Sequence, residues 1–426
     1  MQSRKIASVG RHKRNLKNKE HSGIRIKPVF FEESAFLLIL KLGGIDMKIN
    51  FNYEVVACAE IDKFAFASAK ELLNIKDCIN MWDVRNVLRY QLPAFNCLFA
   101  GFPCQSLSLI GKGAGVSWTC ECGHTYNPLD LPPDRRFICP ECGCESENRN
   151  ETPSSLIVYV LKAIELYHPN LVILENVANL LSAKFKPLFN QITREIASYG
   201  YNVYAEKLNA RDYGSVQNRN RVIIVCVKKT IDNGRFKFPK PFAERRNLQD
   251  ILEDCTDVFA DTNASVVIDG KVPPYIKPAI CKEIGYLVES EKDTYILPCK
   301  SGWSDHVIGI NSCPTLRASN STCLVMQKVN LDGKQRYYIK KMTPKERWLA
   351  TGYSAEDYEK VAKITSTTQL CHQTGNSISV EMLVEVFRSI YTALPHLFIN
   401  MKITSLFMGI GAFEKALSVF YAELNQ

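Results

Sequence analysis

The alternation between short apolar runs and helix-like stretches over residues 53–229 most constrains the fold of this chain. Apolar runs of strand length occur at residues 54–62, 95–101, 171–176 and 221–229, and segments with helical spacing of apolar residues lie between them. This alternation predicts a largely parallel sheet with helices on both faces. Such sheets bind ligands at the carboxyl ends of their strands, so the residues that follow each strand are the first candidates for a site.

The charge of the chain is unevenly distributed. The formal net charge is +9, and residues 1–27 contain nine Lys or Arg residues against one acid, Glu20. This basic arm is either a solvated tail or a segment that contacts nucleic-acid phosphates. A moderate basic excess fits a polyanionic partner without identifying one.

The start of the sequence shows no charged-then-apolar export signal, and the apolar run "AFLLIL" before Lys41 is too short to span a bilayer. The chain contains 16 cysteines, and in a reducing interior these are free thiols or metal ligands rather than disulfides. We therefore expect a cytoplasmic protein that has no membrane association.

Two segments carry chemistry by themselves. "LFAGFPCQ" runs from a strand into Cys104, where a cysteine can act as a nucleophile if its thiolate is stabilised; an inert core cysteine is the alternative. "ITSLFMGIGAFEKAL" reads as a strand, a tight turn with Gly409 and Gly411, and the start of a helix. That arrangement lets a nucleotide-like cofactor approach bare backbone.

Several segments together resemble the motifs of the cytosine-C5 DNA methyltransferases. "GFPCQ" resembles the nucleophile motif of that family. The other matching segments, in chain order, are "ACAEID", "WDVRNV", "LENV", "SVQNRNRVIIV", "CPTLRAS" and "QTGNSISVEM". Each motif is weak alone, but together they cover most of residues 53–229 and 311–412 in a consistent layout.

The resemblance implies an α/β, Rossmann-like methyltransferase fold and transfer of the methyl group of S-adenosylmethionine to carbon 5 of a cytosine flipped out of DNA. By resemblance, the Cys104 thiolate adds to C6 of the base. Glu175 binds N3 and N4 and acts as a general acid. Arg219 and Arg221 hold the cytosine O2 and the nearby backbone.

The resemblance also implies a pocket for S-adenosylmethionine. Glu60 would accept hydrogen bonds from the ribose hydroxyls, Ile61 would flank the adenine, and Asp83 would take its amino group. The methionine end and the remaining wall would be formed by Phe407, Gly409, Gly411, Asn376 and Ser377. Ser405 and Ala412 depart from the family, which usually has an acid and a glycine at these positions.

The order of the motifs predicts a circular permutation. In the family the glycine turn comes first and the "GNS" segment last, whereas here the glycine turn follows "GNS". New termini would then lie in the helix between the glycine turn and the ribose-binding strand, which is tolerable where native termini are adjacent. This prediction requires Gly409 and Gly411 to lie beside Glu60.

The motifs predict a domain layout, together with the change after residue 229 from alternating strands and helices to short β-like runs. We expect a basic arm at residues 1–32, a first catalytic part at 33–229, and a closing catalytic part at 321–426. Residues 230–320, with Pro, Gly and short β-like runs, would form a small β-rich target-recognition domain. Residues 119–145 would form an insertion in the catalytic loop.

Cysteine spacing in this insertion predicts a metal site. Cys120 and Cys122 are separated by sixteen residues from the pair Cys139 and Cys142, a pattern typical of a structural zinc ribbon. Cys144 and His124 are alternative ligands, and a cluster of free thiols is the competing interpretation. We expect the ribbon to stiffen the loop after Cys104 or to contact DNA through Arg135 and Arg136.

The leading hypothesis is a bacterial or phage DNA cytosine-C5 methyltransferase that acts as a monomer on double-stranded DNA. A cognate restriction endonuclease is a further candidate partner. The alternatives are a tRNA cytosine-C5 methyltransferase, a catalytically inactive DNA-binding relative, and a zinc-ribbon nucleic-acid adaptor. A separate unit at residues 230–310 favours duplex DNA over tRNA, because such a unit can read the major groove.

Overall fold

A computed structural model describes residues 52–73, 75, 77–104, 115–145, 149–253, 265–267, 294–297, 309–318, 323–331 and 334–425. The basic arm, the residues directly after Cys104 and most of the predicted recognition segment lie outside these ranges. Within the described part, no helix has the length and apolar character needed to cross a membrane.

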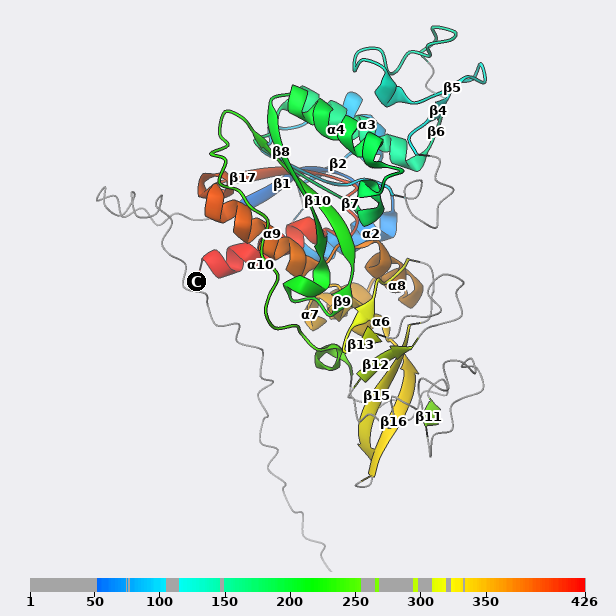
Figure 1. The fold of residues 1–426 in the computed structure, drawn as a ribbon, viewed down its shortest axis with the longest axis vertical. Coiled ribbons are helices and arrows are strands. Elements are labelled where there is room, and N and C mark those ends of the chain that lie inside the picture. The colour runs from blue at the N-terminus through cyan, green and yellow to red at the C-terminus, as the bar shows by residue number, and fades with distance from the viewer. Residues whose placement is uncertain are drawn as a thin grey trace, which may run out of the picture. The chain divides into compact units, whose positions relative to one another are not determined.

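A seven-stranded sheet forms the centre of the fold (Figure 1). Five neighbouring strands are parallel, and the strand beyond them is antiparallel to both of its neighbours. The predicted, largely parallel sheet is therefore confirmed. In spatial order its strands are β2 (Ile79–Asn80), β1 (Tyr53–Ala59), β17 (Met401–Leu406), β3 (Cys97–Gly101), β7 (Leu171–Val177), β10 (Asn220–Lys228) and β8 (Tyr201–Asn209).

Helices cover both faces of this sheet, because successive residues of a buried strand point to opposite sides. On β3, Phe99 belongs to the core under α9 (Val380–Ala393) and α10 (Ala412–Leu424). Its ring centroid lies 5.0 Å from that of Phe413. Leu98 belongs to the opposite core, with α3 (Ile157–Tyr167) and α4 (Lys186–Ser198). Both cores are continuous along the strands, which explains the unbroken apolar runs in the sequence.

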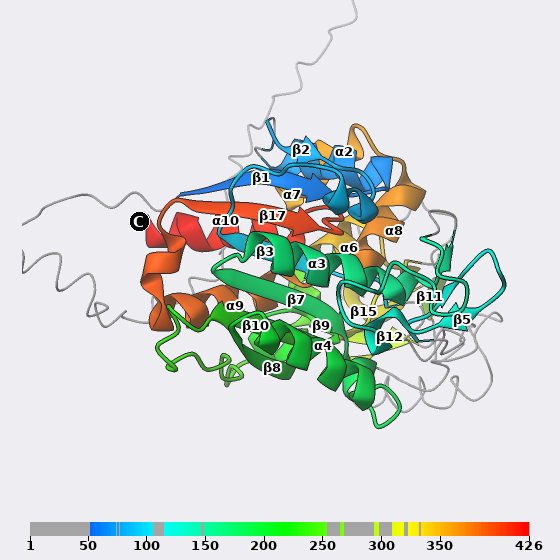
Figure 2. The ribbon, with the colours of Figure 1, turned by 90° about the horizontal axis from the view of Figure 1, so that it is seen from above.

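The strand β17 occupies the middle of the sheet although it follows every other described strand in the chain (Figure 2). Ser405 pairs with Cys58 of β1 on one side and with Phe99 of β3 on the other. The helix α10 that follows carries Tyr421, whose ring stacks on Tyr53 at the start of β1. The C-terminal segment is therefore part of the main core.

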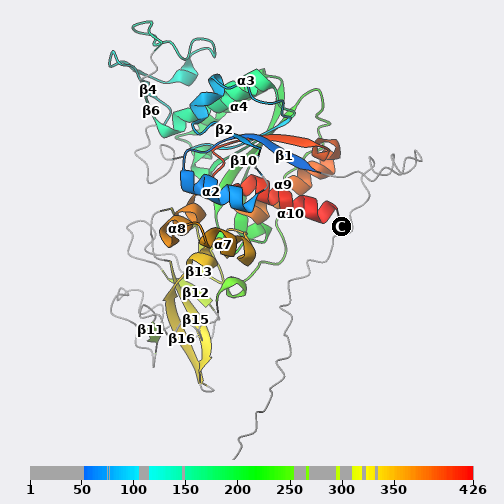
Figure 3. The same cartoon turned by 180° about the vertical axis from the view of Figure 1, so that it is seen from behind.

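A second, five-stranded sheet lies in the region predicted to recognise the target (Figure 3). Its last two strands lie beyond residue 320, so the sheet crosses the domain boundary that we placed there. The short strand β14 (Cys313–Pro314) pairs with β9 (Gln217–Asn218). This pair connects the segment that carries the second sheet to the catalytic part. In spatial order the five strands are β11 (Ser265–Val267), β16 (Lys334–Lys341), β15 (Leu324–Leu331), β12 (Thr294–Leu297) and β13 (Gly309–Ile310).

Short helices follow this sheet and precede the last long ones. They are α6 (Pro344–Leu349), α7 (Ala355–Ala362) and α8 (Thr367–Asn376). Near the start of the chain, α2 (Lys63–Leu72) begins at Asp62, whose carboxylate accepts hydrogen bonds from the amides of Phe64 and Ala65. This cap ends the segment after β1 and fixes the direction in which the chain leaves Glu60.

The insertion forms a small three-stranded sheet of β4 (Trp118–Thr119), β5 (Thr125–Tyr126) and β6 (Asn150–Glu151). Trp118 is fully buried, and its indole N–H donates to the Ser155 hydroxyl at 2.8 Å. The guanidinium of Arg149 lies 4.3 Å from the centre of the indole ring. These contacts anchor the insertion to the chain that leads into α3.

Candidate active site and metal centre

The predicted nucleophile and general acid lie at the same edge of the sheet. Gly101 at the end of β3 is paired with Glu175 on β7, and Cys104 follows three residues later. The Glu175 carboxylate forms an ion pair with Arg221, in which Oε1 lies 2.6 Å from Nε. The Asn176 side chain donates to the carbonyl of Phe102 at 3.0 Å and thereby ties the segment before Cys104 to β7.

Electrostatic effects of opposite sign act on the Cys104 thiol. Burial and the nearby Glu175 carboxylate raise the pKa of Cys104 above its usual value, whereas the guanidinium groups of Arg221 and Arg219 lower it. Burial dominates, so the sulfur is held mainly as a thiol in this arrangement. The two cations provide the electrostatic stabilisation that a thiolate would need here.

Arg219 occupies a different position from Arg221. It is 2% exposed, and its two Nη groups donate to the carbonyls of Leu316 and Gly375, at 3.1 and 3.0 Å. Burial, followed by the charge of Arg221, lowers the pKa of Arg219 to about 9. Arg219 thus joins the "CPTLRAS" and "GNS" segments through their main chains, and Arg221 is the arginine that pairs with the acid.

The same two segments approach each other so closely that Gly375 is required. A Cβ atom at residue 375 would lie 2.0 Å from the main-chain nitrogen of Ala318. Backbone atoms cannot move aside as a flexible side chain can, so any larger residue would separate the two segments. The sequence showed a glycine here, but it did not show which backbone it faces.

The glycine turn and the predicted ribose-binding acid are in direct contact. The amide of Gly409 donates to Oε2 of Glu60 at 2.7 Å, and the amide of Asp62 donates to Oε1 at the same distance. Burial raises the pKa of Glu60, although these main-chain donors oppose the shift. The predicted proximity of the turn to Glu60 is confirmed despite their separation in the sequence.

Glycine is needed in this turn for its backbone conformation. Gly409 and Gly411 have φ angles of 58° and 77°, in the left-handed region. A Cβ atom on Gly411 would also lie 2.3 Å from Cδ1 of Leu73. Phe407, in the same turn, also has a left-handed φ of 57°. Because this residue is not a glycine, its conformation adds backbone strain to the turn.

The other predicted cofactor residues differ in their surroundings. Ile61 is 70% exposed, Asn376 is exposed and Ser377 is buried. Asp83 forms an ion pair with Arg85 at 2.6 Å. Burial of Asp83 acts in the opposite direction, but the hydrogen bonds and charge of Arg85 lower the pKa of the Asp83 carboxyl.

Glu414, at the start of α10, is a buried acid that the sequence did not single out. It is fully buried, and neither carboxylate oxygen has a hydrogen-bonding partner at normal distance. Burial raises its pKa to about 7, and the nearby Ser405 hydroxyl offsets only part of this shift. Nothing in the local sequence signals this burial, because the acid lies at an ordinary position in the first turn of a helix.

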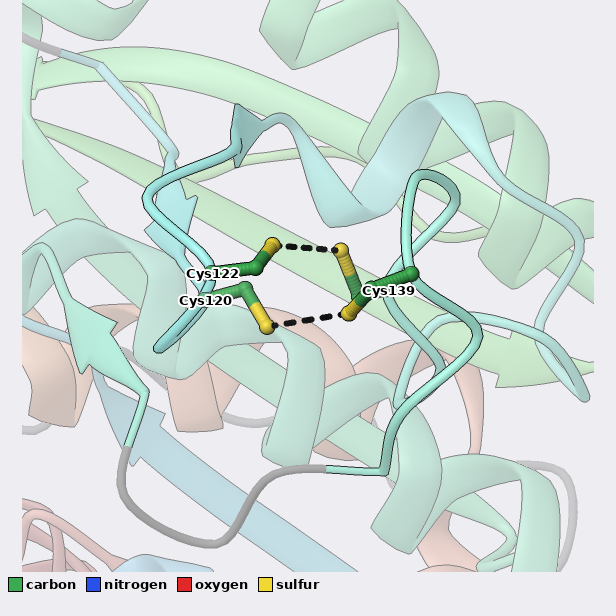
Figure 4. A group of neighbouring side chains, drawn as sticks. Cys120, Cys122 and Cys139 are labelled. Atoms are coloured by element: carbon green, nitrogen blue, oxygen red, sulfur yellow. Dashed lines mark hydrogen bonds between the residues drawn. The ribbon is translucent and has the colours of Figure 1, made fainter.

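The four cysteines predicted to bind zinc form one cluster (Figure 4). Cys120 and Cys142 have their sulfurs 3.6 Å apart, and Cys122 and Cys139 have theirs 3.8 Å apart. All four sulfurs lie within 4.8 Å of one another. Tetrahedral zinc with bonds of about 2.3 Å places its sulfurs about 3.8 Å apart, so this donor set fits zinc.

The alternative ligands do not join this group. The sulfur of Cys144 lies 3.9 Å from the carbonyl of Cys142, and the ring of His124 stacks on that of Tyr126. Glycines with positive φ, Gly123 and Gly143, allow each pair of cysteines to turn back toward the cluster.

The segment between the two cysteine pairs docks on α4. Arg136 is 4% exposed, and its Nη1 donates to Oε1 of Glu195 at 2.6 Å. The side chain of Gln191 donates to the carbonyl of Leu129 at 2.6 Å. The prediction that Arg136 contacts DNA is therefore wrong, because this guanidinium is buried and paired; Arg135 remains exposed.

Comparison with known proteins identifies the family. The family described as "C-5 cytosine-specific DNA methylase" matches residues 38–121 and 143–392, and the chain belongs to this family. Membership implies DNA as the substrate class and S-adenosylmethionine as the methyl donor. The matched ranges omit residues 122–142, within the predicted insertion, and end before β17.

The chain is similar to methyltransferases from phages and bacteria. It is 23% identical to the orphan methyltransferase M.SPBetaI of Bacillus phage SPbeta, over 89% of this chain and 99% of that protein. It is 28% identical to the type II methyltransferase M2.ScrFI of Lactococcus lactis subsp. cremoris, over 73% and 71%. A solved structure of a Spodoptera frugiperda DNMT2 mutant aligns with a TM-score of 0.46 and 13% identity, covering 82% of this chain and 94% of that one.

Proposed function

We propose that this protein transfers a methyl group to carbon 5 of a flipped-out cytosine in a specific DNA sequence, through a covalent bond to Cys104. The observation that carries the proposal is the arrangement of Cys104, Glu175 and Arg221 at one edge of the sheet. Family membership supports a methyltransferase reaction on DNA. The separate five-stranded sheet supports duplex DNA rather than tRNA as the substrate.

Cys104, Glu175 and Arg221 each have a separate role in the proposed reaction. The Cys104 sulfur forms a bond to C6 of the base, while Glu175 binds N3 and N4 and donates a proton that makes C5 nucleophilic. Arg221 holds Glu175 and offsets the negative charge near the sulfur. After the methyl group is on C5, loss of the C5 proton expels the sulfur, breaks its bond to C6 and restores the aromatic ring.

The residues around the glycine turn fit S-adenosylmethionine, which supplies a methyl cation when bound. Each oxygen of Glu60 accepts one main-chain N–H and keeps a lone pair that a ribose hydroxyl can use. Gly409 presents no side chain, and a Cβ built there meets nothing within 4 Å. The turn therefore leaves room for a ligand beside the ribose-binding acid.

Bisulfite sequencing tests this function directly. The protein is expressed in a host without cytosine methylation, and both genomic DNA and tRNA are sequenced. We expect C5 methylation at one DNA sequence with the wild type and none with Cys104→Ser. Methylation confined to tRNA would support the alternative enzyme, and no methylation with a protein that still binds DNA would support an inactive relative.

The proposal also includes a structural zinc ion bound by Cys120, Cys122, Cys139 and Cys142. Its support is the compact set of four sulfurs in an insertion that the family match omits. Metal analysis of purified protein is expected to give one zinc per chain. Purified protein without zinc would contradict the assignment.

Circular permutation is the third part of the proposal. Its support is that β17 lies between β1 and β3 and that Gly409 contacts Glu60, whereas the family match ends at residue 392. The test is a rearranged gene in which residues 398–425 precede residue 48 through a short linker. We expect this protein to methylate the same DNA sequence; an unfolded product would contradict the permutation.

A further inference from the structure

Two acids contact the glycine turn after β17, and they differ in what holds them. Each oxygen of Glu60 accepts one main-chain N–H. Glu414, in the first turn of α10, is fully buried, and neither of its carboxylate oxygens has a hydrogen-bonding partner at normal distance. A buried polar group without a partner destabilises the fold, so stability does not explain why this acid is present.

The Glu414 carboxyl lies against the turn itself. A Cβ atom on Gly411 would be 3.4 Å from Oε2 of Glu414. Gly409, two residues earlier in the same turn, donates its amide to Glu60. The turn that is proposed to hold the methyl donor therefore has one carboxyl group at each of its two glycines.

None of the described residues forms an ion pair with Glu414. The adjacent Lys415 is paired with Asp357 of α7, with Nζ 2.8 Å from Oδ2. The hydroxyl of Ser405 on β17 and the main-chain amide of Glu414 itself favour the carboxylate form, and they offset only part of the effect of burial. A buried acid without a paired cation, beside a ligand-binding turn, fits a ligand that brings the positive charge.

Glu414 is the group in this part of the core that changes charge near pH 7, because burial raises its pKa to about 7. The other titratable groups that interact with it are Tyr53 and Cys58 on β1, Cys97 on β3, and Tyr353 before α7. Burial raises the pKa of both tyrosines and of Cys97, and a hydrogen bond with Cys78 raises the pKa of Cys58. These groups therefore stay neutral while Glu414 titrates.

We propose that Glu414 is a counter-charge for the sulfonium of S-adenosylmethionine, and that it releases a proton to solvent when this cation binds. This inference rests on the proposed function, because it takes S-adenosylmethionine as the methyl donor. The donor has a positively charged sulfur, whereas the sulfur of the product, S-adenosylhomocysteine, is neutral. A carboxylate beneath the turn therefore favours the donor over the product, and Glu414 takes a proton back from solvent once the methyl group has left.

This coupling makes the affinity for S-adenosylmethionine depend on pH. A bound cation favours the ionised carboxylate and lowers the pKa of Glu414 in the complex, so the affinity rises as pH increases through 7. If the pKa falls by about one unit, the affinity at pH 8 is about 10-fold higher than with a neutral side chain, and at pH 6 it is only about twofold higher.

The test is calorimetry of both ligands with the full-length protein, without DNA, at pH 6 and pH 8. Glu414→Gln keeps the size of the side chain and stays neutral. We expect it to bind S-adenosylmethionine about 10-fold more weakly than the wild type at pH 8 and within about twofold at pH 6. S-adenosylhomocysteine should bind equally to both proteins. Comparison at one pH cancels the titration of the ligand's own amino group.

Glu381→Gln is the matched control. Glu381 is also an acid in the first turn of a long helix, α9, and burial also raises its pKa. It packs against Gly352, where a Cβ atom would lie 2.2 Å from its Oε2, rather than against the glycine turn. This variant should bind both ligands as the wild type does.

Proton release gives a readout that is independent of affinity. Titrations at pH 7 in two buffers of different ionisation enthalpy should show that the wild type releases about 0.4 proton more per S-adenosylmethionine than Glu414→Gln does. In the wild type alone, release should be greater with S-adenosylmethionine than with S-adenosylhomocysteine, a result that does not depend on how the variant folds.

The possible outcomes separate this inference from the proposed function. Equal proton release by the wild type and Glu414→Gln overturns the inference alone. A Glu414→Gln protein that binds both ligands more weakly by the same factor assigns Glu414 a purely structural role and also overturns it. A wild type that binds neither ligand overturns the proposed function with it.

Discussion

The Cys104 site and the four-cysteine cluster surround their sulfurs in two different ways. Cys104 lies near one carboxylate and two guanidinium groups, and burial keeps its pKa raised. In the insertion, four sulfurs lie within 4.8 Å of one another, a donor set that fits a tetrahedral metal ion. In the proposed function the first sulfur forms a bond to the base, and the other four hold one zinc ion.

The contrast teaches that cysteine count says little about cysteine function. A sulfur flanked by an acid and cations at a strand end can form and break a bond to carbon. Sulfurs at tetrahedral separation on two turns can only serve architecture once a metal is bound. If the two sets of sulfurs are as independent as their surroundings indicate, replacing a sulfur of one set should leave the function of the other set intact.

Replacing the single sulfur should have the largest effect. Cys104→Ser is expected to reduce methylation by about 1,000-fold or more, because the hydroxyl is a much weaker nucleophile at neutral pH. Binding of S-adenosylhomocysteine should be unchanged, since Cys104 is not in the proposed cofactor pocket. The measurement is tritiated methyl transfer to DNA, and activity within tenfold of the wild type would remove Cys104 from the nucleophile role.

Replacing a cluster sulfur should affect the insertion and leave the reaction chemistry intact. Cys120→Ser is expected to abolish zinc binding and to expose the segment between the cysteine pairs to protease, because structural zinc supplies the folding energy of such units. Cys144→Ser is the matched control and should retain zinc. Limited proteolysis with mass spectrometry measures both, and a protease-resistant Cys120→Ser insertion would contradict a metal-held structure.

Glu414 extends the comparison, because it is a buried acid that forms no ion pair with any of the described residues. Its pKa of about 7 lies above the ordinary value of 4.5, so the folded state takes up a proton between these values and loses stability as pH rises through them. By pH 8 the loss amounts to about 3 kcal/mol, at about 1.4 kcal/mol per pH unit.

Glu414→Gln should remove most of this pH dependence and raise stability at pH 8 while changing it little at pH 4.5. Urea unfolding at the two pH values gives the difference. Equal stability changes at both would show that Glu414 ionises normally in the folded protein.

The pH dependence of Cys104 alkylation should give the smallest effect. Because its pKa is raised, modification by iodoacetamide should increase with pH through and beyond the ordinary thiol range. Glu175→Gln removes a negative charge and should shift the profile to lower pH, and Arg221→Met should shift it to higher pH. Peptide mapping measures the rate at Cys104 alone; identical profiles in both variants would exclude electrostatic control of this sulfur.

The sequence was sufficient to predict the strands and turns that carry the site residues, but not the contacts that those residues make. Apolar runs identify the strands that carry Glu175 and Cys104, since a strand buried on both faces needs an unbroken apolar sequence. The cysteine spacing likewise identified the four sulfurs that come together. The local sequence pattern was sufficient for both predictions, because each of these residues lies next to the strand or turn that positions it.

The remaining contacts depend on packing between distant segments. Arg136 looked like a free basic residue, and only docking of the insertion on α4 pairs it with Glu195. Gly375 gave no sign that it meets the backbone at Ala318. The amide of Trp82, a residue with a positive φ of 62°, donates to Oδ1 of Asn80, and the apolar pattern of the sequence does not predict this hydrogen bond.

The position of β17 has a consequence for synthesis of the protein. During translation, β1 and β3 leave the ribosome long before the strand that separates them, and their facing edges have no partner until residues 401–406 are made. Such open edges invite pairing with other chains. A nascent chain stalled before β17 should therefore depend on chaperones far more than the released protein does.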